Sequence, residues 1–270
     1  MEEEPTPQES RETEGAMVAS RYLDGRGVLQ LDAKFPGLYV DYYLHLMQHG
    51  LRYEAAHDLL LKEALAALTL HLASRPWDET IAWTWHLENI GVNLFVTGSN
   101  PLGEVTGRIF TEDVRSTQQN LFFSQVARTN HANRQSVISF DQTTAFEIVE
   151  AFYEQSQQQL GRYFDLGNEH NSLVVAMPGA DTDWIRALNN EQASTLPANP
   201  EASLLETRTY RFACQCTLRR ILGALSALGA ETGESLFEDD TPLIITCPRC
   251  GARYETTRQA LRDLRDDRAE

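Results

Sequence analysis

All four cysteines of this 270-residue chain lie between residues 214 and 250, as two close pairs. One residue separates Cys214 from Cys216, thirty residues follow, and two residues separate Cys247 from Cys250, with Gly251 directly after them. Two close thiol pairs on tight turns are typical of a tetrahedral zinc site. Because no histidine lies in this stretch, the sequence predicts one zinc ion held by four thiolates.

The same cysteines could also form two disulfides or remain free thiols. No basic segment followed by an apolar run stands at the N-terminus, so we expect a reducing compartment, which favours zinc. On chemistry alone, a purely structural zinc site is the commoner kind. Neighbouring sulfurs of a tetrahedral site nevertheless lie about 3.8 Å apart, and a disulfide needs about 2.05 Å, so oxidation requires little movement.

Oxidation of these thiols would lower the folding stability of the zinc-binding domain. A Cys247–Cys250 disulfide would remove two ligands at once, and zinc binding worth on the order of 10 kcal/mol is also folding free energy for a domain this small. A Cys214–Cys216 disulfide closes a shorter and more strained ring, so we expect it to form second.

The two cysteine pairs, the segment ending in Tyr254 and the run VISFDQTTAFEIVEAFYEQSQQQLGRYFDL at residues 137–166 resemble the heat-shock protein 33 family. Looser similarity, which includes Met177 and Pro178, extends over most of residues 17–270. The resemblance implies a cytoplasmic, ATP-independent holdase chaperone that is inactive when reduced and zinc-bound. It also implies activation by hypochlorite or peroxide with mild unfolding, binding of unfolded proteins under oxidative stress, and a homodimer in the oxidised form.

The resemblance gives each cysteine a role in this switch. The zinc ligands would be Cys214, Cys216, Cys247 and Cys250. The redox disulfides would be Cys214–Cys216 and Cys247–Cys250.

Composition divides the chain into four segments. Residues 1–16 carry six glutamates and two prolines with few apolar side chains, which predicts a disordered acidic tail. Residues 17–178 are expected to form an α+β core domain, to which the resemblance assigns client binding and dimerisation. A short, partly helical linker would follow at residues 179–206, and a small zinc-binding redox-switch domain at residues 207–270.

The core domain shows both helical and strand patterns. Residues 53–73 predict a helix, because leucines recur there at helical spacing. Residues 80–87 alternate strictly and predict a strand, with Trp83 and Trp85 on one face. Further strands are expected at residues 92–97, 104–110, 121–128, 135–140 and 172–177.

Thr144 and Glu147 form a capping box that predicts the start of a helix, and we expect a turn at Gly161. Strands with helices set apart, rather than in regular alternation, predict an α+β fold with a mainly antiparallel sheet.

The linker contains short apolar clusters that we expect to dock on the core domain, namely Trp184, Ile185, Leu188, Leu204 and Leu205. In the resembled family, a metastable linker covers the client-binding surface. This linker is shorter, so we expect it to bury less apolar surface and its docked state to be less stable. The reduced protein should therefore keep some holdase activity.

Other functions find little support in the sequence. A net charge of −16 argues against a nucleic-acid partner, and no apolar run is long enough for a membrane span. His45 and His49 lack the glutamate and third ligand of a zinc protease, and no phosphate-binding loop or nucleophile elbow occurs, so we expect no enzyme.

The alternative function is a protein-interaction module whose zinc is purely structural. Such a module would dock to a partner through Arg219, Arg220, Arg249 and Arg253. For a chaperone, the aromatic residues Trp83, Trp85, Phe95, Phe122 and Phe123 are candidates for a client surface, although core packing is the more favoured role for each.

Overall fold

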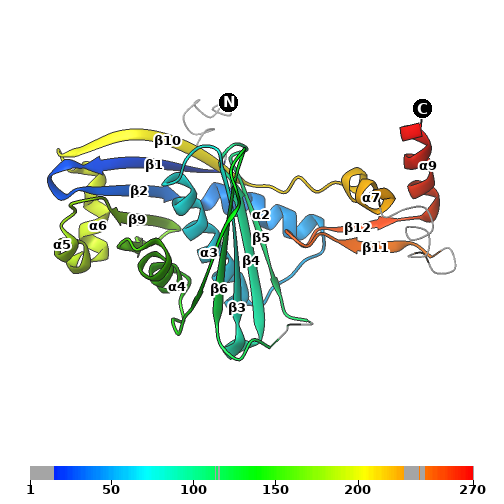
Figure 1. Ribbon diagram of the computed structural model, residues 1–270, viewed down its shortest axis with the longest axis horizontal. Helices are drawn as coiled ribbons and strands as arrows, with labels where there is room; N and C mark the ends of the chain where they lie inside the picture. Colours follow the sequence, from blue (N-terminus) through cyan, green and yellow to red (C-terminus); the bar gives the residue numbers. More distant parts are fainter. Residues whose placement is uncertain (1–14, 113, 115, 228–236, 238–240, 270) are drawn as a thin grey trace, which may run out of the picture. The chain divides into compact units, whose positions relative to one another are not determined.

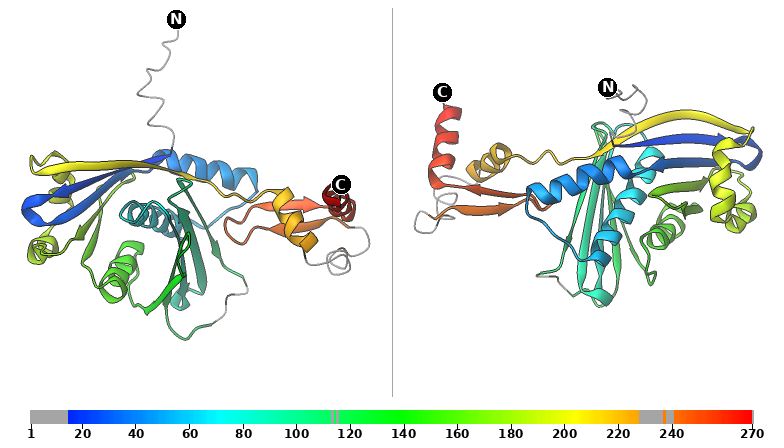
Figure 2. Two further views of the ribbon diagram at one scale, coloured as in Figure 1. Left: turned by 45° about the horizontal axis from the view of Figure 1, so that its top comes forward. Right: turned by 180° about the vertical axis from the view of Figure 1, so that it is seen from behind.

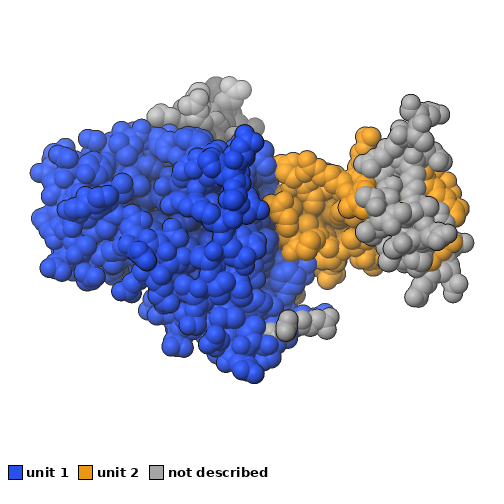
Figure 3. Space-filling model, in the orientation of Figure 1, with its two compact units in different colours: residues 1–44, 53–213 blue, residues 45–52, 214–270 orange. Residues whose placement is uncertain are grey.

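The computed structural model describes residues 15–112, 114, 116–227, 237 and 241–269 (Figure 1). The chain divides into two compact units, which Figure 3 colours separately: unit 1 is Met1–Leu44 with Tyr53–Ala213, and unit 2 is His45–Arg52 with Cys214–Glu270. The predicted acidic tail at residues 1–16 lies outside the described residues, apart from Gly15 and Ala16.

Unit 1 is built on a ten-stranded sheet in the order β7-β6-β3-β4-β5-β10-β1-β2-β9-β8. Its strands are β1 (Ala16–Leu23), β2 (Val28–Lys34), β3 (Glu79–Leu87), β4 (Val92–Ser99), β5 (Glu104–Phe110), β6 (Leu121–Arg128), β7 (Arg134–Ser139), β8 (Gly161–Asp165), β9 (His170–Ala176) and β10 (Ala202–Phe212). All neighbours pair antiparallel except β5 and β10, which pair in parallel at two positions only. The sheet therefore turns sharply at β10 into two halves (Figure 2).

Helix α3 (Ala55–Ala73) lies between the two halves of the sheet (Figure 1). It contacts β4 and β5 of one half and β1, β2 and β9 of the other. Consequently almost every residue from Leu61 to Ala73 is buried. The predicted leucine stripe is thus one side of a helix that is enclosed all round, as expected for a helix in the middle of a core.

Strand β3 confirms the alternation seen in the sequence. Ile81, Trp83, Trp85 and Leu87 are buried, and the residues between them are only half-buried. Trp83 and Phe122 pack edge to face with ring centroids 5.2 Å apart, and Phe122 stacks on Phe152 at 4.6 Å. Trp83, Trp85 and Phe122 therefore belong to the core, whereas Phe95 and Phe123 are half-buried.

Helix α4 (Ala145–Phe152) begins where the sequence predicts, since the Thr144 hydroxyl accepts a hydrogen bond from the Glu147 backbone N–H. The helix continues as a π-helical turn at Tyr153–Gln157, and Gln158 ends it in the left-handed region at φ 51°. The turn predicted at Gly161 is wrong, because Gly161 is the first residue of β8. A Cβ atom there would lie 2.7 Å from the Tyr153 ring, so this position requires glycine for close packing.

The predicted linker contains helices α5 (Thr182–Ala187) and α6 (Asn190–Thr195), followed by a 3₁₀ turn at Leu196–Ala198. Ile185 and Leu188 are buried in one apolar cluster with Val28 and Val174 of the sheet, and Trp184 packs against its edge. Leu204 and Leu205 were also expected to dock, but both are 59% exposed on β10. That expectation is wrong for these two residues. They lie on a strand that pairs with β1, not on a helix that packs on the sheet, and this pairing determines that their side chains face solvent.

The described residues of unit 2 form two small apolar clusters. One lies at the hairpin of β11 (Leu243–Thr246) and β12 (Arg253–Thr256) and contains the cysteines themselves. Helix α7 (Leu218–Ala227) and helix α9 (Arg258–Ala269) form the other around Leu222, Phe237 and Leu261. Helix α2 (Pro36–Gln48) ends in the segment that belongs to this unit.

The α+β class with a mainly antiparallel sheet is therefore confirmed, and the four-cysteine segment lies near the C-terminus as expected. Strand β10 runs across the predicted domain boundary at residues 206 and 207. Among the described helices, none combines the length and apolar character needed to cross a membrane.

Candidate metal centre

The four cysteines come together in unit 2 from two separate segments. Cys214 and Cys216 lie between the end of β10 and the start of α7. Cys247 and Cys250 lie in the connection between β11 and β12. Their four Sγ atoms are all within 4.8 Å of one another. The sulfurs of Cys214 and Cys247 are 4.0 Å apart, and those of Cys216 and Cys250 are 3.4 Å apart.

The hairpin connection is a tight turn shaped by backbone hydrogen bonds. The Gly251 N–H donates to the Cys247 carbonyl at 2.9 Å, and the Cys247 N–H donates to the Ala252 carbonyl at 2.8 Å. Gly251 has a φ of 77°, which glycine adopts without strain. The turn thereby directs Cys247 and Cys250 to the same side, and both are almost fully buried.

Tyr254 closes one side of the cluster. Its hydroxyl donates to the Cys216 carbonyl at 2.8 Å and lies 3.4 Å from the Cys216 sulfur. The tyrosine ring packs against the same small apolar cluster as Cys250 and Ala252. The sequence pointed to Tyr254 only through the family resemblance. Its position four residues after Cys250, on a hairpin strand, is the signal that could have suggested a contact with the cysteine cluster.

His45 and His49 also lie in unit 2. A ring nitrogen of His45 is 3.0 Å from the Cys250 carbonyl, and one of His49 is 3.3 Å from the Arg253 carbonyl. Burial lowers the pKa of His45. Neither histidine belongs to the group of side chains that could hold an ion among the described residues, and their contacts fit a packing role.

The clustered thiols influence each other's ionisation. Contact with the Cys214 and Cys250 thiols lowers the pKa of Cys247 far below its ordinary value. The hydrogen bond to Cys247 raises the pKa of Cys214 to about 12, and contact with Cys214 and Cys247 raises the pKa of Cys250 strongly. Without a cation, the cluster thus favours one thiolate, because a second negative charge so close would be repelled.

This donor set fits zinc. Four sulfurs around one ion at about 2.3 Å would lie about 3.8 Å from each other, and the two sulfur separations given above bracket that distance. A cation would also allow all four thiols to ionise together. All four cysteines are free thiols in this structure.

The arginines of the alternative interaction surface all lie in unit 2 and are exposed: Arg219, Arg220, Arg249 and Arg253. Arg220 also donates to the Gln215 carbonyl at 2.6 Å. Their exposure is compatible with docking to a partner, and equally with a solvated surface.

Comparison with known proteins relates the chain to one family. The family model described as Hsp33 protein matches residues 165–257. The chain is 24% identical to the 33 kDa chaperonin of Pectobacterium atrosepticum over 249 residues, which covers 80% of this chain and 86% of the relative. It is 28% identical to that of Serratia proteamaculans over 236 residues, which covers 75% and 80%.

The fold is similar to that of a solved relative. The crystal structure of the 33 kDa chaperonin from Thermotoga maritima matches with a TM-score of 0.70 and 13% identity. The match covers 94% of this chain and 99% of the other. At this level of identity the likeness shows the fold alone.

Proposed function

Because the resemblance to the heat-shock protein 33 family is confirmed, we propose that this chain is a redox-regulated, ATP-independent holdase chaperone. It would bind unfolded or aggregation-prone proteins in the cytoplasm under oxidative stress, perform no enzymatic reaction, and dimerise when oxidised. The observation that carries the proposal is the gathering of all four thiols at metal-binding distance in a unit whose described residues form little other core.

In the reduced form, Cys214, Cys216, Cys247 and Cys250 would hold one zinc ion as thiolates. When bound, zinc would supply a crosslink between the two cysteine segments and a charge that keeps the thiols ionised. The apolar clusters of unit 2 contain only a few buried side chains each. Such clusters bury too little surface to fold a domain of this size without a crosslink or metal.

Oxidation would proceed through the paired thiols. Closing Cys247–Cys250 joins two thiolate sulfurs, and the two electrons that leave them, with two protons from solvent, reduce one hydrogen peroxide molecule to two water molecules. The Cys214–Cys216 disulfide would form afterwards with a second peroxide, because its ring is more strained. Loss of the four-thiolate set would then unfold the segment of residues 207–270 that we assigned to the switch.

The linker would pass this change to the core domain. Helices α5 and α6 cover an apolar part of the sheet that includes Val28, Phe164 and Val174. The guanidinium of Arg162 donates to the carbonyls of Ile185, Arg186 and Leu188, with the shortest distance 2.8 Å, and so binds the end of α5. If α5 and α6 detach, this apolar surface becomes available to clients.

The decisive experiment follows zinc and activity together. Reduced protein is treated with peroxide or hypochlorite while a chromogenic chelator reports zinc release and light scattering reports aggregation of a heat-denatured client. We expect about one zinc per chain to leave, with suppression of aggregation rising in parallel and reversing on reduction. The variant Cys247→Ser lacks both a zinc ligand and the first disulfide, so it should release no zinc and its suppression of aggregation should not change with oxidant.

The exposed arginines of unit 2 leave a second candidate, a protein-interaction module with a structural zinc site. Zinc that stays bound under oxidant, together with no suppression of aggregation in either redox form, would favour that module over the chaperone.

A further inference from the structure

A pocket of about 170 Å³ lies in unit 1. It is lined by His71 and Arg75 at the end of α3, by Ser124 and Val126 of β6, by Arg134, Gln135 and Ser136 of β7, and by Phe152, Ser156 and Gln157 of α4 and the π-helical turn. Strand register builds one wall, because Ser124 pairs with Ser136 and Val126 with Arg134. Directly paired residues point to the same face of a sheet.

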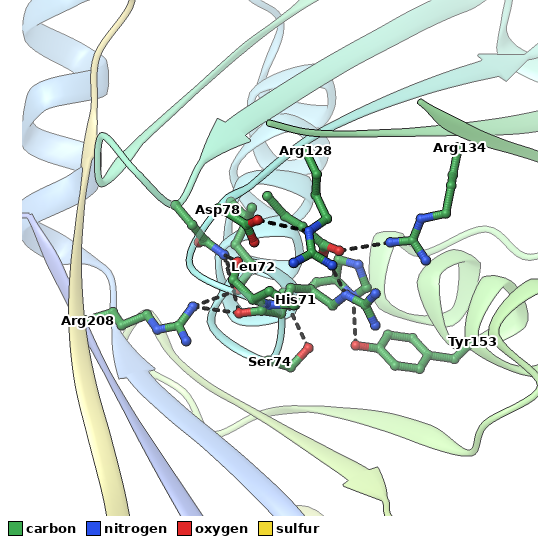
Figure 4. Close-up of polar contacts among 12 residues, drawn as sticks. His71, Leu72, Ser74, Asp78, Arg128, Arg134, Tyr153 and Arg208 are labelled. Carbon is green, nitrogen blue, oxygen red and sulfur yellow. Dashed lines mark hydrogen bonds and ion pairs between the residues drawn. The ribbon is translucent and has the colours of Figure 1, made fainter. Parts of the chain in front are cut away.

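Two guanidinium groups line this pocket, and one buried carboxylate positions both. Glu79 is 1% exposed, and it accepts from Arg75 Nε at 3.0 Å and from Arg134 at 2.8 Å. Figure 4 shows Arg134 reaching this carboxylate, with Arg128 directed to Asp78 beside it. Each of these bonds uses one of the five N–H donors of a guanidinium. Arg75, Arg134 and Glu79 together carry one net positive charge, and among the described residues no acidic side chain lines the pocket.

Neutral polar groups complete the lining. Ser124 is 2% exposed, and its side chain lines the pocket. Its hydroxyl can donate or accept a hydrogen bond to a bound ligand. His71 is held by the Tyr153 hydroxyl at 2.7 Å, and its burial lowers its pKa to about 3, so the ring is neutral. The π-helical turn supplies Ser156 and Gln157, and such turns are frequent at functional sites.

We propose that this pocket binds a small organic monocarboxylate. The single net positive charge matches one carboxylate, and guanidinium groups bind carboxylates through paired, charge-assisted hydrogen bonds. Phe152 and Val126 offer an apolar wall for a short carbon chain. The volume corresponds to about five or six water molecules, which suits an acid of about that many heavy atoms and is below the size of most drug-like ligands.

The test is calorimetric titration of the reduced, full-length protein with butyrate. Butyramide has the same shape without the charge, and inorganic phosphate is a rival anion. We expect saturable butyrate binding, with butyramide and phosphate each at least about tenfold weaker, as the loss of a charge-assisted hydrogen bond implies. The measurement requires neither zinc release nor a client, so its failure would leave the proposed chaperone function untouched.

Variants identify the pocket as the binding site. Arg134→Gln should weaken butyrate binding about tenfold or more, and Ser124→Ala should weaken it several-fold. Arg128→Gln removes the same charge from the neighbouring strand without touching the pocket and should leave the affinity within about twofold. The proposal is overturned by absent saturation, by equal binding of butyramide, by tighter binding of phosphate, or by equal losses in the Arg128 and Arg134 variants.

Discussion

Leu188 and Leu205 offer a matched test of how the linker is held. Leu188 is 5% exposed and packs in the apolar cluster under α5 and α6, whereas Leu205 is 59% exposed on β10. The change Leu188→Ala removes buried methyl groups and leaves a cavity. Replacements of this kind cost about 2 to 5 kcal/mol, and a position at the end of a short helix can collapse partly, so we expect about 2 to 3 kcal/mol.

A loss of that size lowers the ratio of docked to detached linker by about 30- to 150-fold. Amide hydrogen exchange of reduced, zinc-bound protein should therefore show faster exchange across residues 182–198. Suppression of thermal aggregation by the reduced protein should also rise above that of the unmodified chain, for which the short linker already predicts some activity.

Leu205→Ala makes the same chemical change at an exposed position and should alter stability by no more than about 0.5 kcal/mol. Both the exchange rates and the reduced-state activity should match those of the unmodified protein. If Leu188→Ala left exchange of the linker unchanged, or if both variants behaved alike, the idea that α5 docking gates the activity would be refuted.

Three further predictions concern the cysteines and His71. Metal analysis of protein purified under reducing conditions should find about one zinc per chain, and serine at Cys250 should abolish it and unfold unit 2 while unit 1 keeps its near-ultraviolet signal. Peptide mapping of partly oxidised protein should find Cys247–Cys250 before Cys214–Cys216; accumulation of the second bridge alone would contradict the order. His71 has a folded pKa of about 3 against an ordinary 6.5, so the unfolded chain binds an extra proton between these values and stability falls as the pH drops below 6.5. From pH 7 to pH 5 this should cost about 2 kcal/mol in urea unfolding of unit 1, and His71→Gln should remove that part of the pH dependence.

Local patterns in the sequence predicted the elements whose structure depends on near neighbours. Strand β3 follows the alternation of Trp83 and Trp85, α3 follows its leucine spacing, and α4 begins at Thr144. The cysteine spacing likewise predicted that four sulfurs would gather, because each pair is placed by its own short turn. Strands β1, β2, β8 and β10 were not predicted. The partners of β10, which are β1 and β5, lie far away along the chain, whereas β1 pairs with β2 and β8 with β9 across short connections.

Only the tertiary structure decided which linker residues are buried and where the pocket of unit 1 forms. Leu188 and Leu205 are equally apolar, and what distinguishes them is that β10 pairs with β1 while α5 lies on the sheet. Arg75 is a near neighbour of Glu79 in the sequence, whereas Arg134 reaches Glu79 because β3 pairs with β6 and β6 pairs with β7, which brings residues 55 positions apart into contact. Sequence periodicity determines which face of an element is apolar, whereas sheet register and packing determine what that face meets.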